Sequence, residues 1–504
     1  MLLQQLLLDG ADRTPDRTAF HWVERGTSLS YSEAVEGMER VAGGLSSLGV
    51  ERGDRVGIFA HNGMDHLLAM FGAWRLGAIC ALVNVQYADR LDYYVNDAQP
   101  RVLIYTGDHH ETIERHRAQL AGVQHYLCLD GPKAGSLSWP DLLDGAPAPP
   151  PDVSEETDIA HLSYTSGTSG DPKGACLAHE PTMRATRCIA ERLRIQASDV
   201  SLGPTALSSS YHLVANLLPA LHRGATVCVM SRWEAEKGWV SLEELGATIL
   251  AANPTILRDV LDVSRRRGRP PVRLRLSLSG GAPVPPELKL AWRDELRVTL
   301  AESYGQSELG GFVALGSPDP VTDERVLACG QPLPDKEVRI LDDAGREVRV
   351  GTIGEICLRG GFMAGYWQRP EKTAETLRGG WLHTGDVGYM DPEQYVFMRG
   401  RLSERLRVAG EYLYPRDVEE VLVQHAGVRE AALIGLPDPE LGQRPVAYVT
   451  LRGEAIDREQ LARLAEERLG RALPRLVVQV IDAMPMTPTG KISKAQLLAA
   501  AGAP

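Results

Sequence analysis

The chain has 504 residues, 43% hydrophobic and 24% charged, which is long enough for two or more domains with ordinary globular cores. Its formal net charge of -12 argues against a nucleic-acid partner, and its longest apolar window, residues 67–85, is interrupted by Arg75, which argues against a membrane span. The seven cysteines are scattered without a CxxC pair, which argues against a disulfide framework or a zinc knot and favours a reducing, cytoplasmic compartment.

An amphipathic helix is predicted near the N-terminus. Its apolar residues at helical spacing are Val35, Met38, Val41, Leu45 and Leu48. Ser30 and Glu33 have the spacing of a capping box in front of this stripe, and Gly49 stands where the helix should end. We therefore expect a helix that begins just after Ser30 and ends before Gly49.

Strand-like and helix-like segments alternate over the first 300 residues. The buried strands predicted from apolar runs are 55–60, 101–107, 224–230, 247–254, 274–283 and 297–305. Such alternation is typical of α/β layers with largely parallel sheets. The fold class predicted is therefore α/β, with a large N-terminal domain of several subdomains.

Two changes in character along the chain predict domain boundaries. The segment 144–153, "DGAPAPPPDV", is a proline-rich connector that should divide two subdomains. After "MRGRLSER" a compact segment with its own strand and helix patterns follows. We expect an N-terminal domain over 1–402 and a small α+β C-terminal domain over 403–504.

The stretch "YTSGTSGDPKG", Tyr164 to Gly174, combines three glycines with hydroxyl side chains and one lysine. Backbone amides in a glycine-rich turn can converge on phosphate oxygens, because no Cβ blocks the approach. The preceding residues alternate as a strand should, so the loop leaves a sheet edge. Taken alone, an anion cradle and an ordinary flexible loop are about equally supported by this pattern.

Five further segments follow in a fixed order: "SGGAPVP", "ESYGQSE", a central block from "GEICLRG" to "GWLHTGDVGYMD", "GRLSERLRVAGEYLYPRDVEEVL" and "PMTPTGKISK". Together with the glycine-rich loop they resemble the ordered motifs of the adenylate-forming enzymes, the superfamily of acyl-CoA synthetases, luciferases and peptide-synthetase adenylation domains. The resemblance covers nearly the whole chain. It implies a large N-terminal domain with mostly parallel sheets and a small mobile C-terminal domain.

The resemblance implies an ATP site assembled from several segments. The loop that would wrap the β- and γ-phosphates contains Thr165, Ser166, Gly167, Thr168, Ser169, Gly170 and Lys173. The turn that would line the adenine contains Gly280, Gly281, Ala282 and Pro283, with Tyr304 and Gly305 beside it.

Five more residues would carry the chemistry in this resemblance. Ser307 would contact phosphate, and Glu308 would supply the hard oxygen ligand that Mg²⁺ prefers. Asp386 would accept hydrogen bonds from the ribose hydroxyls, assisted by Arg401. Lys491 would lie between the substrate carboxylate and the α-phosphate and offset the charge there. Outside these motifs, each would be taken for an ordinary turn or surface residue.

The C-terminal motifs depart from the family pattern at two places. The hinge position is Ser403, where the family commonly has Asp or Lys. Gly410 matches the glycine past which pantetheine reaches the site, although a turn glycine explains it equally well. The usual "GGEN" is "AGEY" here, with Ala409 and Tyr412, so the thiol site is expected to differ in detail.

The acyl pocket is expected to draw on Ser208, His212, Glu302 and Gly310. Many members carry an aromatic–histidine pair in front of a glycine-rich helix, and counting back from Pro219 places that histidine near Ser208 or Ser209. Either the loop is one residue longer and His212 lines the pocket from a shifted place, or the gate is absent. A pocket with Glu302 nearby would favour a substrate that carries a cation or a hydroxyl group.

The activity implied is that of an acid–thiol ligase. A small-molecule carboxylic acid, ATP with Mg²⁺, and CoA would give an acyl-CoA, AMP and pyrophosphate through an acyl-adenylate. Two alternative acceptors of the acyl group stay open, a carrier-protein thiol and an amine. The enzyme could also activate an inorganic oxyacid in place of a carboxylic acid. A silent nucleotide-binding protein is disfavoured because Lys173, Glu308, Asp386, Arg401 and Lys491 are all retained. The family also leaves a homodimer open.

Overall fold

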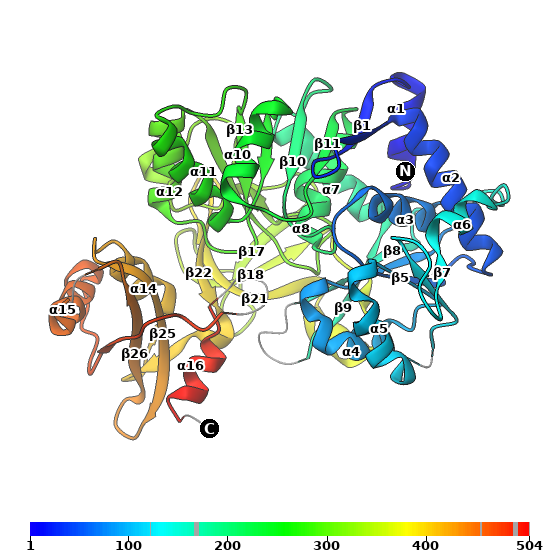
Figure 1. Cartoon of the computed structure of the whole chain (residues 1–504). Helices are drawn as coiled ribbons and strands as arrows, with labels where there is room; N and C mark the ends of the chain where they lie inside the picture. The colour runs from blue at the N-terminus through cyan, green and yellow to red at the C-terminus, as the bar shows by residue number, and fades with distance from the viewer. Residues whose placement is uncertain (121, 166–170, 454–455, 487–491, 503–504) are drawn as a thin grey trace. The chain divides into compact units, whose positions relative to one another are not determined.

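The computed structural model describes residues 1–120, 122–165, 171–453, 456–486 and 492–502. Contacts divide the chain into two compact units, which Figure 1 shows coloured along the sequence. Unit 1 comprises Met1–Val338 and Leu358–Leu382, and unit 2 comprises Arg339–Cys357 and His383–Pro504. The boundary predicted at residue 402 stays a prediction, because this division passes through three strands upstream of it. Within the described ranges, no helix is long and apolar enough to cross a membrane.

The first sheet of unit 1 has eight strands in the order β19-β9-β8-β4-β3-β5-β6-β7. Their bounds are β3 Arg55–Phe59, β4 Ile79–Leu82, β5 Val102–Tyr105, β6 His125–Cys128, β7 Leu137–Ser138, β8 Ile159–Tyr164, β9 Gly174–Ala178 and β19 Gly365–Tyr366. Strands β8, β4, β3, β5 and β6 are parallel neighbours, while β9 runs antiparallel to β8. The glycine-rich loop therefore joins two adjacent antiparallel strands.

The second sheet of unit 1 has nine strands in the order β16-β15-β14-β13-β12-β10-β11-β1-β2. Their bounds are β1 Thr18–Trp22, β2 Thr27–Ser30, β10 Val200–Gly203, β11 Thr226–Val229, β12 Ile249–Ala251, β13 Leu276–Ser279, β14 Thr299–Tyr304, β15 Ala314–Leu315 and β16 Gln331–Pro332. The central strands are parallel. Parallel neighbours end at the same edge, where ligands bind in open α/β sheets.

Both faces of the second sheet are covered, as its alternating side chains show. Leu250 packs into a cluster with Trp239 of α10 and Leu257 of α11, whereas its neighbours Ile249 and Ala251 join the main core. The bounds of the helices of unit 1 are α1 Gln5–Arg13, α2 Tyr31–Ser47, α3 Met64–Arg75, α4 Leu91–Ala98, α5 His110–His116, α6 Trp139–Asp144, α7 His179–Arg192, α8 Ser210–His212, α9 Leu218–His222, α10 Ala235–Glu244, α11 Pro254–Arg267, α12 Pro286–Ala291 and α13 Pro370–Thr376. This is the α/β layering that the sequence predicts.

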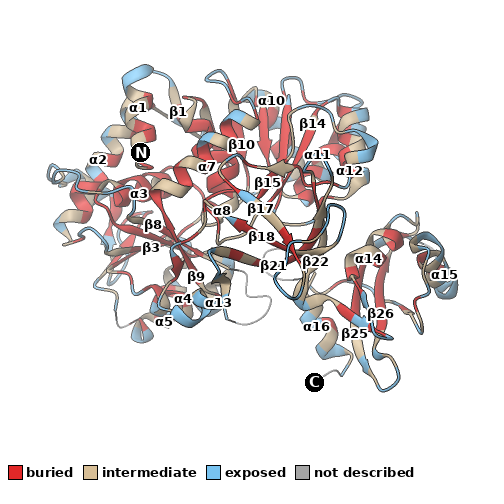
Figure 2. Cartoon of the chain, turned by 180° about the vertical axis from the view of Figure 1, so that it is seen from behind, coloured by how far each residue is buried: buried red, intermediate tan, exposed pale blue. Residues whose placement is uncertain are grey.

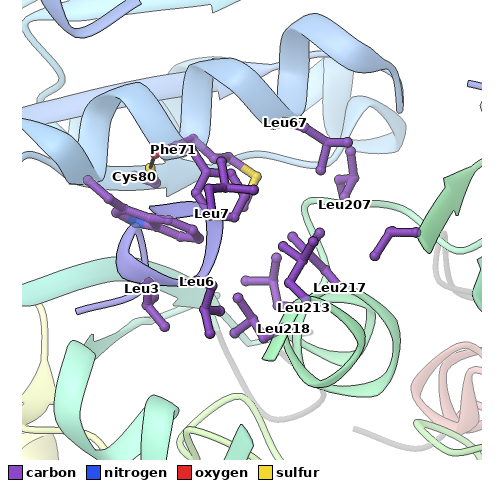
Figure 3. Close-up of a cluster of buried hydrophobic side chains, with 14 of the residues drawn as sticks. Leu3, Leu6, Leu7, Leu67, Phe71, Cys80, Leu207, Leu213, Leu217 and Leu218 are labelled. Carbon is purple, nitrogen blue, oxygen red and sulfur yellow. Dashed lines mark hydrogen bonds between the residues drawn. The ribbon is translucent and has the colours of Figure 1, made fainter. Parts of the chain in front are cut away.

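The main core of unit 1 joins the two sheets through apolar helices. Figure 3 shows leucines of the N-terminal segment, among them Leu6 and Leu7, pointing toward Phe71 of α3 and toward Leu213 and Leu217. All of these side chains are buried. Burial of one such side chain contributes about 1.5–3 kcal/mol, so this cluster is a principal source of stability for the unit. Figure 2 shows the same burial in red along the strands and inner helix faces.

The predicted N-terminal helix is confirmed as α2. Ser30 Oγ accepts a hydrogen bond from the Glu33 amide at 3.2 Å, and Glu33 Oε2 accepts one from the Ser30 amide at 2.7 Å. This reciprocal pair is the predicted capping box. The helix ends at Ser47, and Gly49 follows with a φ of +78°.

A five-stranded sheet, β17-β18-β21-β20 with β22 paired to β21, contains the strands through which the division of the chain passes. Their bounds are β17 Glu337–Leu341, β18 Gly354–Arg359, β20 Leu377–Arg378, β21 Trp381–Met390 and β22 Val396–Arg401. The rest of unit 2 is a mixed sheet, β24-β23-β26-β25 with β27 parallel to β26. Its elements are β23 Leu406–Val408, β24 Glu411–Leu413, β25 Val428–Asp438, β26 Gly442–Leu451, β27 Val477–Val480, α14 Pro415–Val423, α15 Arg458–Leu469 and α16 Lys494–Ala500.

Candidate active site

The two ends of the glycine-rich loop are tied to each other. Strands β8 and β9 pair up to Tyr164 and Gly174, and beyond them the Thr165 amide donates to Lys173 O at 3.0 Å. The Lys173 amide donates back to Thr165 Oγ1 at 3.2 Å. The loop residues predicted to wrap phosphates, Ser166, Gly167, Thr168, Ser169 and Gly170, lie outside the described residues.

Strand β19 brings the predicted phosphate and metal residues together. Tyr366 pairs with Ala175 on β9, and its ring lies 5.3 Å from Lys173 Nζ. The Tyr366 hydroxyl donates to Glu308 Oε1 at 2.6 Å. A cation and a carboxylate thus contact the same tyrosine from two sides. Ser307, next to Glu308, donates a long hydrogen bond of 3.5 Å to Tyr164 O.

Glu308 fits the role of a magnesium ligand. The structure gives Oε1 a hydrogen bond from Tyr366 and gives Oε2 none within the described part of the chain. An ionised carboxylate oxygen is the hard ligand that Mg²⁺ takes in nucleotide sites, usually with waters and phosphate oxygens. The donor set is therefore compatible with Mg²⁺ bound through Glu308 and ATP phosphates.

The predicted adenine turn leaves the carboxyl end of β13. A Cβ at Gly280 would lie 2.2 Å from Ser303 Oγ, so only glycine fits there. Gly281 has a φ of +76°, which also favours glycine. The turn continues through Ala282 and Pro283. The neighbouring parallel strand β14 ends at Tyr304, which is 7% exposed. Stacking of Tyr304 on adenine stays a prediction.

Gly305 and Gly310 lie where backbone and side chains approach closely. A Cβ at Gly305 would lie 3.0 Å from Phe312 Cδ1, and one at Gly310 would lie 2.9 Å from the Thr182 backbone. Packing alone requires glycine at 310, where a Cβ would overlap the backbone, whereas a Cβ at 305 would only crowd Phe312. Their predicted ligand contacts therefore stay predictions.

Asp386 and Arg401 lie opposite each other on β21 and β22 of unit 2. Arg401 Nε lies 2.8 Å from Asp386 Oδ1, the Asp386 side chain is 3% exposed, and that of Arg401 is 40% exposed. The antiparallel ladder fixes this spacing. The two residues predicted to hold the ribose are thus brought together.

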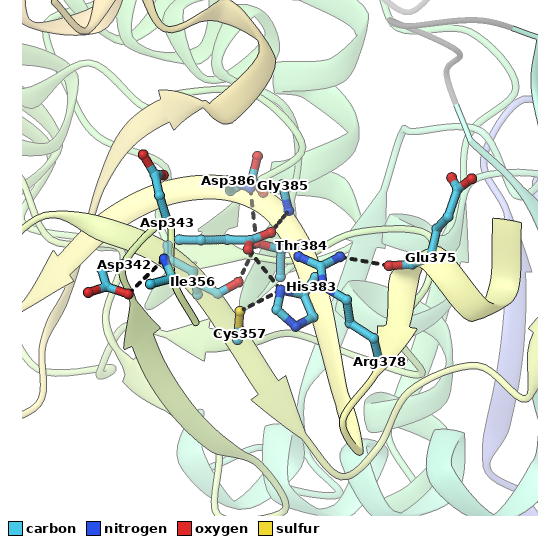
Figure 4. A network of polar contacts seen from close by, with 12 residues as sticks. Asp342, Asp343, Ile356, Cys357, Glu375, Arg378, His383, Thr384, Gly385 and Asp386 are labelled. Atoms are coloured by element: carbon cyan, nitrogen blue, oxygen red, sulfur yellow. Dashed lines mark hydrogen bonds and ion pairs between the residues drawn. The ribbon is translucent and has the colours of Figure 1, made fainter. Parts of the chain in front are cut away.

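Figure 4 shows how the turn before Asp386 is braced. Gly385 and His383, both labelled there, are held by Glu355 on β18. Glu355 accepts from the Gly385 amide through Oε1 at 3.1 Å, and its Oε2 lies 2.8 Å from His383 Nδ1. Thr384 Oγ1 donates to Ile356 O at 2.6 Å and accepts from the Asp386 amide at 3.0 Å. The sequence prediction missed Glu355, His383 and, in unit 1, Tyr366, although all three stand inside the segments that carry the resemblance.

The C-terminal predictions receive less support from geometry. Ser403 lies exposed in the short turn Leu402–Glu404. Gly410 and Ala409 have φ values of +86° and +51° and form the two-residue connection between β23 and β24. Such a hairpin turn requires positive φ at both positions, so the turn by itself explains Gly410. Lys491 lies outside the described residues.

His212 is buried and both of its ring nitrogens are engaged. Nδ1 lies 2.8 Å from Thr205 O, to which it donates, and Nε2 accepts from Asn216 Nδ2 at 3.2 Å. Burial lowers the pKa of His212 to about 4, so the ring is neutral at pH 7. This ring has no polar atom left for a substrate, so a place for it in an acyl pocket would rest on shape.

The residue before His212 was missed by sequence reasoning. The Tyr211 hydroxyl donates to Leu278 O at 2.8 Å, and its ring centroid lies 6.2 Å from that of Phe312. A Cβ at Gly280 would lie 3.0 Å from Tyr211 Cε2. The tyrosine therefore lies beside the predicted adenine turn. Ser208, one of the positions expected from counting, is half-buried in the loop before α8.

Glu302 is paired inside the protein. Its carboxylate forms an ion pair with Lys289 of α12, and these side chains are 5% and 2% exposed. Lys289 Nζ also donates to Val326 O at 2.8 Å and to Ala328 O at 2.9 Å. An internal cation thus neutralises Glu302, which weakens the hypothesis that this carboxylate selects a cationic acid.

The chain is similar to known enzymes over nearly its whole length. The family described as AMP-binding enzyme matches residues 7–367, and AMP-binding enzyme C-terminal domain matches residues 417–491. A feruloyl-CoA synthase of Amycolatopsis sp is 33% identical over 478 residues, 94% of each chain. The fatty acid–[acyl-carrier-protein] ligase ScoC of Streptomyces coeruleorubidus is 31% identical over 483 residues, 94% of this chain and 91% of that one. The structure of the anthranilate CoA ligase AuaEII in complex with anthranoyl-AMP has a TM-score of 0.91 and 26% identity, and the match covers 100% of this chain and 97% of that one.

Proposed function

The chain belongs to the AMP-binding enzymes of the adenylate-forming superfamily, and we infer from this membership that it is an AMP-forming acid–thiol ligase. A carboxylic acid attacks the α-phosphorus of ATP, which forms an acyl-adenylate and releases pyrophosphate. The thiol of CoA then attacks the acyl carbon, and AMP leaves with the bonding electron pair. Adenylation is needed because a carboxylate repels nucleophiles and its oxide is a poor leaving group.

The observation that carries this function is the convergence of Lys173 and Glu308 on Tyr366 beside the loop end at Thr165. Phosphoryl transfer needs charge neutralisation and positioning more than it needs covalent chemistry. One fixed cation and one free carboxylate oxygen at the mouth of a glycine-rich loop supply both. We expect Lys173 to bind the β- and γ-phosphates and Ser307 to donate to a phosphate oxygen.

Mg²⁺ bound at Glu308 would neutralise phosphate charge when ATP is present. In unit 2, Asp386 would accept from the ribose hydroxyls while Arg401 orients its carboxylate. Glu355 and Thr384 keep the turn before Asp386 in place. Lys491 would donate to the acid and the α-phosphate during adenylation.

An aromatic or arylacrylic acid is the proposed substrate class. The relatives act on feruloyl and anthranilate groups by name. The Tyr211 ring lies beside Gly280, and the Phe312 ring, whose centroid is 6.2 Å from that of Tyr211, lies beside Gly305. Aromatic side chains favour a flat apolar substrate through offset contacts. The neutralised Glu302 gives no reason to expect a cationic acid.

A carrier-protein thiol is the second acceptor to consider, because a relative of nearly equal identity is named a fatty acid–[acyl-carrier-protein] ligase. Its pantetheine arm presents the same thiol chemistry as CoA.

The test is pyrophosphate release from ATP and Mg²⁺ with a panel of aryl, arylacrylic, short-chain and long-chain acids, first without a thiol. CoA, and separately a phosphopantetheinylated carrier protein, are then added and thioesters are identified by mass. We expect aryl acids to release pyrophosphate and CoA to give the thioester. Transfer to the carrier protein alone would replace CoA as acceptor, and a preference for aliphatic acids would overturn the substrate class. No acid-dependent pyrophosphate at all would overturn the ligase function.

A further inference from the structure

Two neighbouring parallel strands of unit 1 end beside a cluster of metal-ligating side chains. Strands β3 and β5 pair in register up to Phe59 and Tyr105. His61 follows β3 by two residues, while Asp108 and His109 follow β5 in the short turn Gly107–His109. The carboxyl edge of a parallel sheet is where loops from separate strands bring their side chains together to form binding sites.

The three side chains approach each other closely. His61 Nε2 lies 2.8 Å from Asp108 Oδ2, and the His61 and His109 ring centroids lie 5.0 Å apart. One ligand atom from each residue falls within 4.8 Å of the other two. The turn that holds two of the ligands is fixed from the next strand, because Asp130 Oδ2 accepts from the Gly107 amide at 2.6 Å.

We propose that His61, Asp108 and His109 bind one divalent transition-metal ion, such as Zn²⁺, Co²⁺ or Ni²⁺. Two imidazoles and one carboxylate are borderline ligands that suit these ions and leave coordination positions open. The side chains of His61 and Asp108 are 38% and 59% exposed, so an ion reaches the cluster from solvent. Mg²⁺, which prefers oxygen ligands and water, fits a site of this composition poorly.

His109 supplies an independent observation. Its Nε2 is shielded from solvent and has no hydrogen-bond partner among the residues described. Phe59 packs against the same ring with a centroid separation of 4.8 Å. A buried ring nitrogen without a partner normally costs free energy, and metal ligation at the ring would orient and satisfy it.

A second cluster of possible ligands, Glu355, Cys357 and His383, has an explanation of its own. Glu355 braces the Gly385 amide and His383 in front of Asp386. None of the three residues of the His61 cluster lies in a segment that carries the family resemblance. The proposed metal ligands are therefore different residues from those predicted to handle ATP.

The loop after β3 connects the proposed metal site to the loop in front of α8, which contains Thr205 and Leu207. Asn62, next to His61, donates to Thr205 O at 2.7 Å and to Met230 O at 2.9 Å, and accepts from the Leu207 amide at 2.7 Å. Thr205 O is also the acceptor for His212 Nδ1. An ion that fixes His61 should therefore stabilise this part of unit 1.

The test is Co²⁺ binding to the full-length chain, freed of any histidine tag, in excess Mg²⁺. Equilibrium dialysis should give one tightly bound Co²⁺ per chain, displaced by Zn²⁺, with a visible spectrum of nitrogen and oxygen ligation. The double variant His61→Ala/His109→Ala should lose this equivalent. The matched control His110→Gln should keep it, because His110 contacts Tyr105 instead. Co²⁺ should also raise the melting temperature of the wild type but not of the double variant.

Three outcomes would overturn the assignment. The first is a thiolate charge-transfer band, which would place the ion at Cys357. The second is an unchanged Co²⁺ stoichiometry in the double variant. The third is loss of Co²⁺ binding in His110→Gln. Absence of tight Co²⁺ binding by the wild type would also overturn it. If the double variant loses folding as judged by circular dichroism, the single variant Asp108→Asn replaces it, because its exposed side chain tolerates substitution. Acid-dependent pyrophosphate release is measured on the same samples, so failure of the metal proposal is distinguishable from failure of the ligase function.

Discussion

Lys491 and Lys494 are three residues apart but are expected to differ in what they do. Lys494 Nζ lies 2.9 Å from both Glu404 and Glu419, so its charge is used inside unit 2. Lys491→Ala should lower the rate of acyl-adenylate formation by roughly 10²–10³-fold, as loss of one charge-stabilising donor does. Single-turnover pyrophosphate release measures this rate. Lys494→Ala, the matched control, should reduce thermal stability and keep adenylation within a few-fold of wild type. Equal effects of both variants on adenylation would contradict the assignment of Lys491.

Tyr366 offers a test of Glu308 as a metal ligand. Tyr366→Phe keeps the ring near Lys173 and removes only the hydroxyl that donates to Glu308. Loss of a hydrogen-bond partner that orients a metal ligand typically lowers metal affinity by about 10–100-fold, so the Mg²⁺ concentration for half-maximal adenylation should rise about tenfold or more. Tyr126→Phe, whose hydroxyl contacts Leu120 O, is the control and should not change it. An unchanged Mg²⁺ requirement in Tyr366→Phe would argue against Glu308 as the ligand.

At the residue scale, sequence reasoning named residues that the structure brings together, although their roles stay predictions. Lys173 and Glu308 were predicted for one site, and the structure brings both to Tyr366. Tyr366 itself was missed because it is 58 positions from Glu308 in the chain, and only folding brings its hydroxyl to that carboxylate. Lys289 was missed because nothing in its local sequence shows that it neutralises Glu302.

At the scale of the element, the capping box of α2 is open to a direct test. Ser30→Ala removes the acceptor for the Glu33 amide and leaves that donor without its cap. The free energy of unfolding should fall by about 1 kcal/mol, with the KM for ATP unchanged. Urea denaturation with Ser32→Ala as the matched control measures it, because Ser32 lies inside the first turn of the same helix. Equal stability of Ser30→Ala and wild type would show that the cap contributes nothing.

Helices and strands with a clear periodic spacing of apolar residues were predictable from the sequence. Elements that form only by pairing with distant parts of the chain were not. The expected strands at 55–60, 274–283 and 297–305 are β3, β13 and β14, with ends shifted by a few residues. Short strands such as β19 exist because a partner strand is present, since two residues cannot signal a strand alone. The π-helical turn over Leu213–Leu217 also has no local signature, although Pro219 just beyond it cannot donate to the helix.

At the scale of the whole molecule, buried histidines should make unit 1 sensitive to acid. Burial lowers the pKa to about 4 for His66, His179 and His212 and to about 3 for His161. The unfolded chain, with histidine pKa values near 6.5, binds more protons below that pH than the folded chain does. The free energy of unfolding is therefore highest above pH 6.5 and decreases as the pH falls toward 4. At pH 5, one such histidine lowers the free energy of unfolding by about 2 kcal/mol.

His161→Leu tests this pH dependence. Neither ring nitrogen of His161 has a hydrogen-bond partner within the described ranges, so an apolar replacement loses no hydrogen bond there. The variant should gain melting temperature relative to wild type at pH 5 and less at pH 8, as calorimetry can measure. A difference that does not change with pH would show that His161 does not contribute to acid sensitivity.

The division of the whole chain was the least predictable feature. Composition changes near residue 402, but compactness depends on contacts of β17, β18 and β21 that sequence patterns do not reveal. The contact division therefore assigns residues 339–357 and 383–402 to unit 2, whereas the composition of the chain gave no reason to separate them from the N-terminal domain.

The opposed placement of Asp386 and Arg401 on two antiparallel strands limits how this part of the chain can change in length. Side chains alternate between the two faces of a strand, so one residue inserted between Gly388 and Met390, or between Val396 and Arg401, would turn one partner to the opposite face. The connecting turn at Asp391–Tyr395 can lengthen without that penalty, because its extra residues leave the ladder unchanged. Natural relatives should therefore vary in the turn and keep a constant number of residues along both strands.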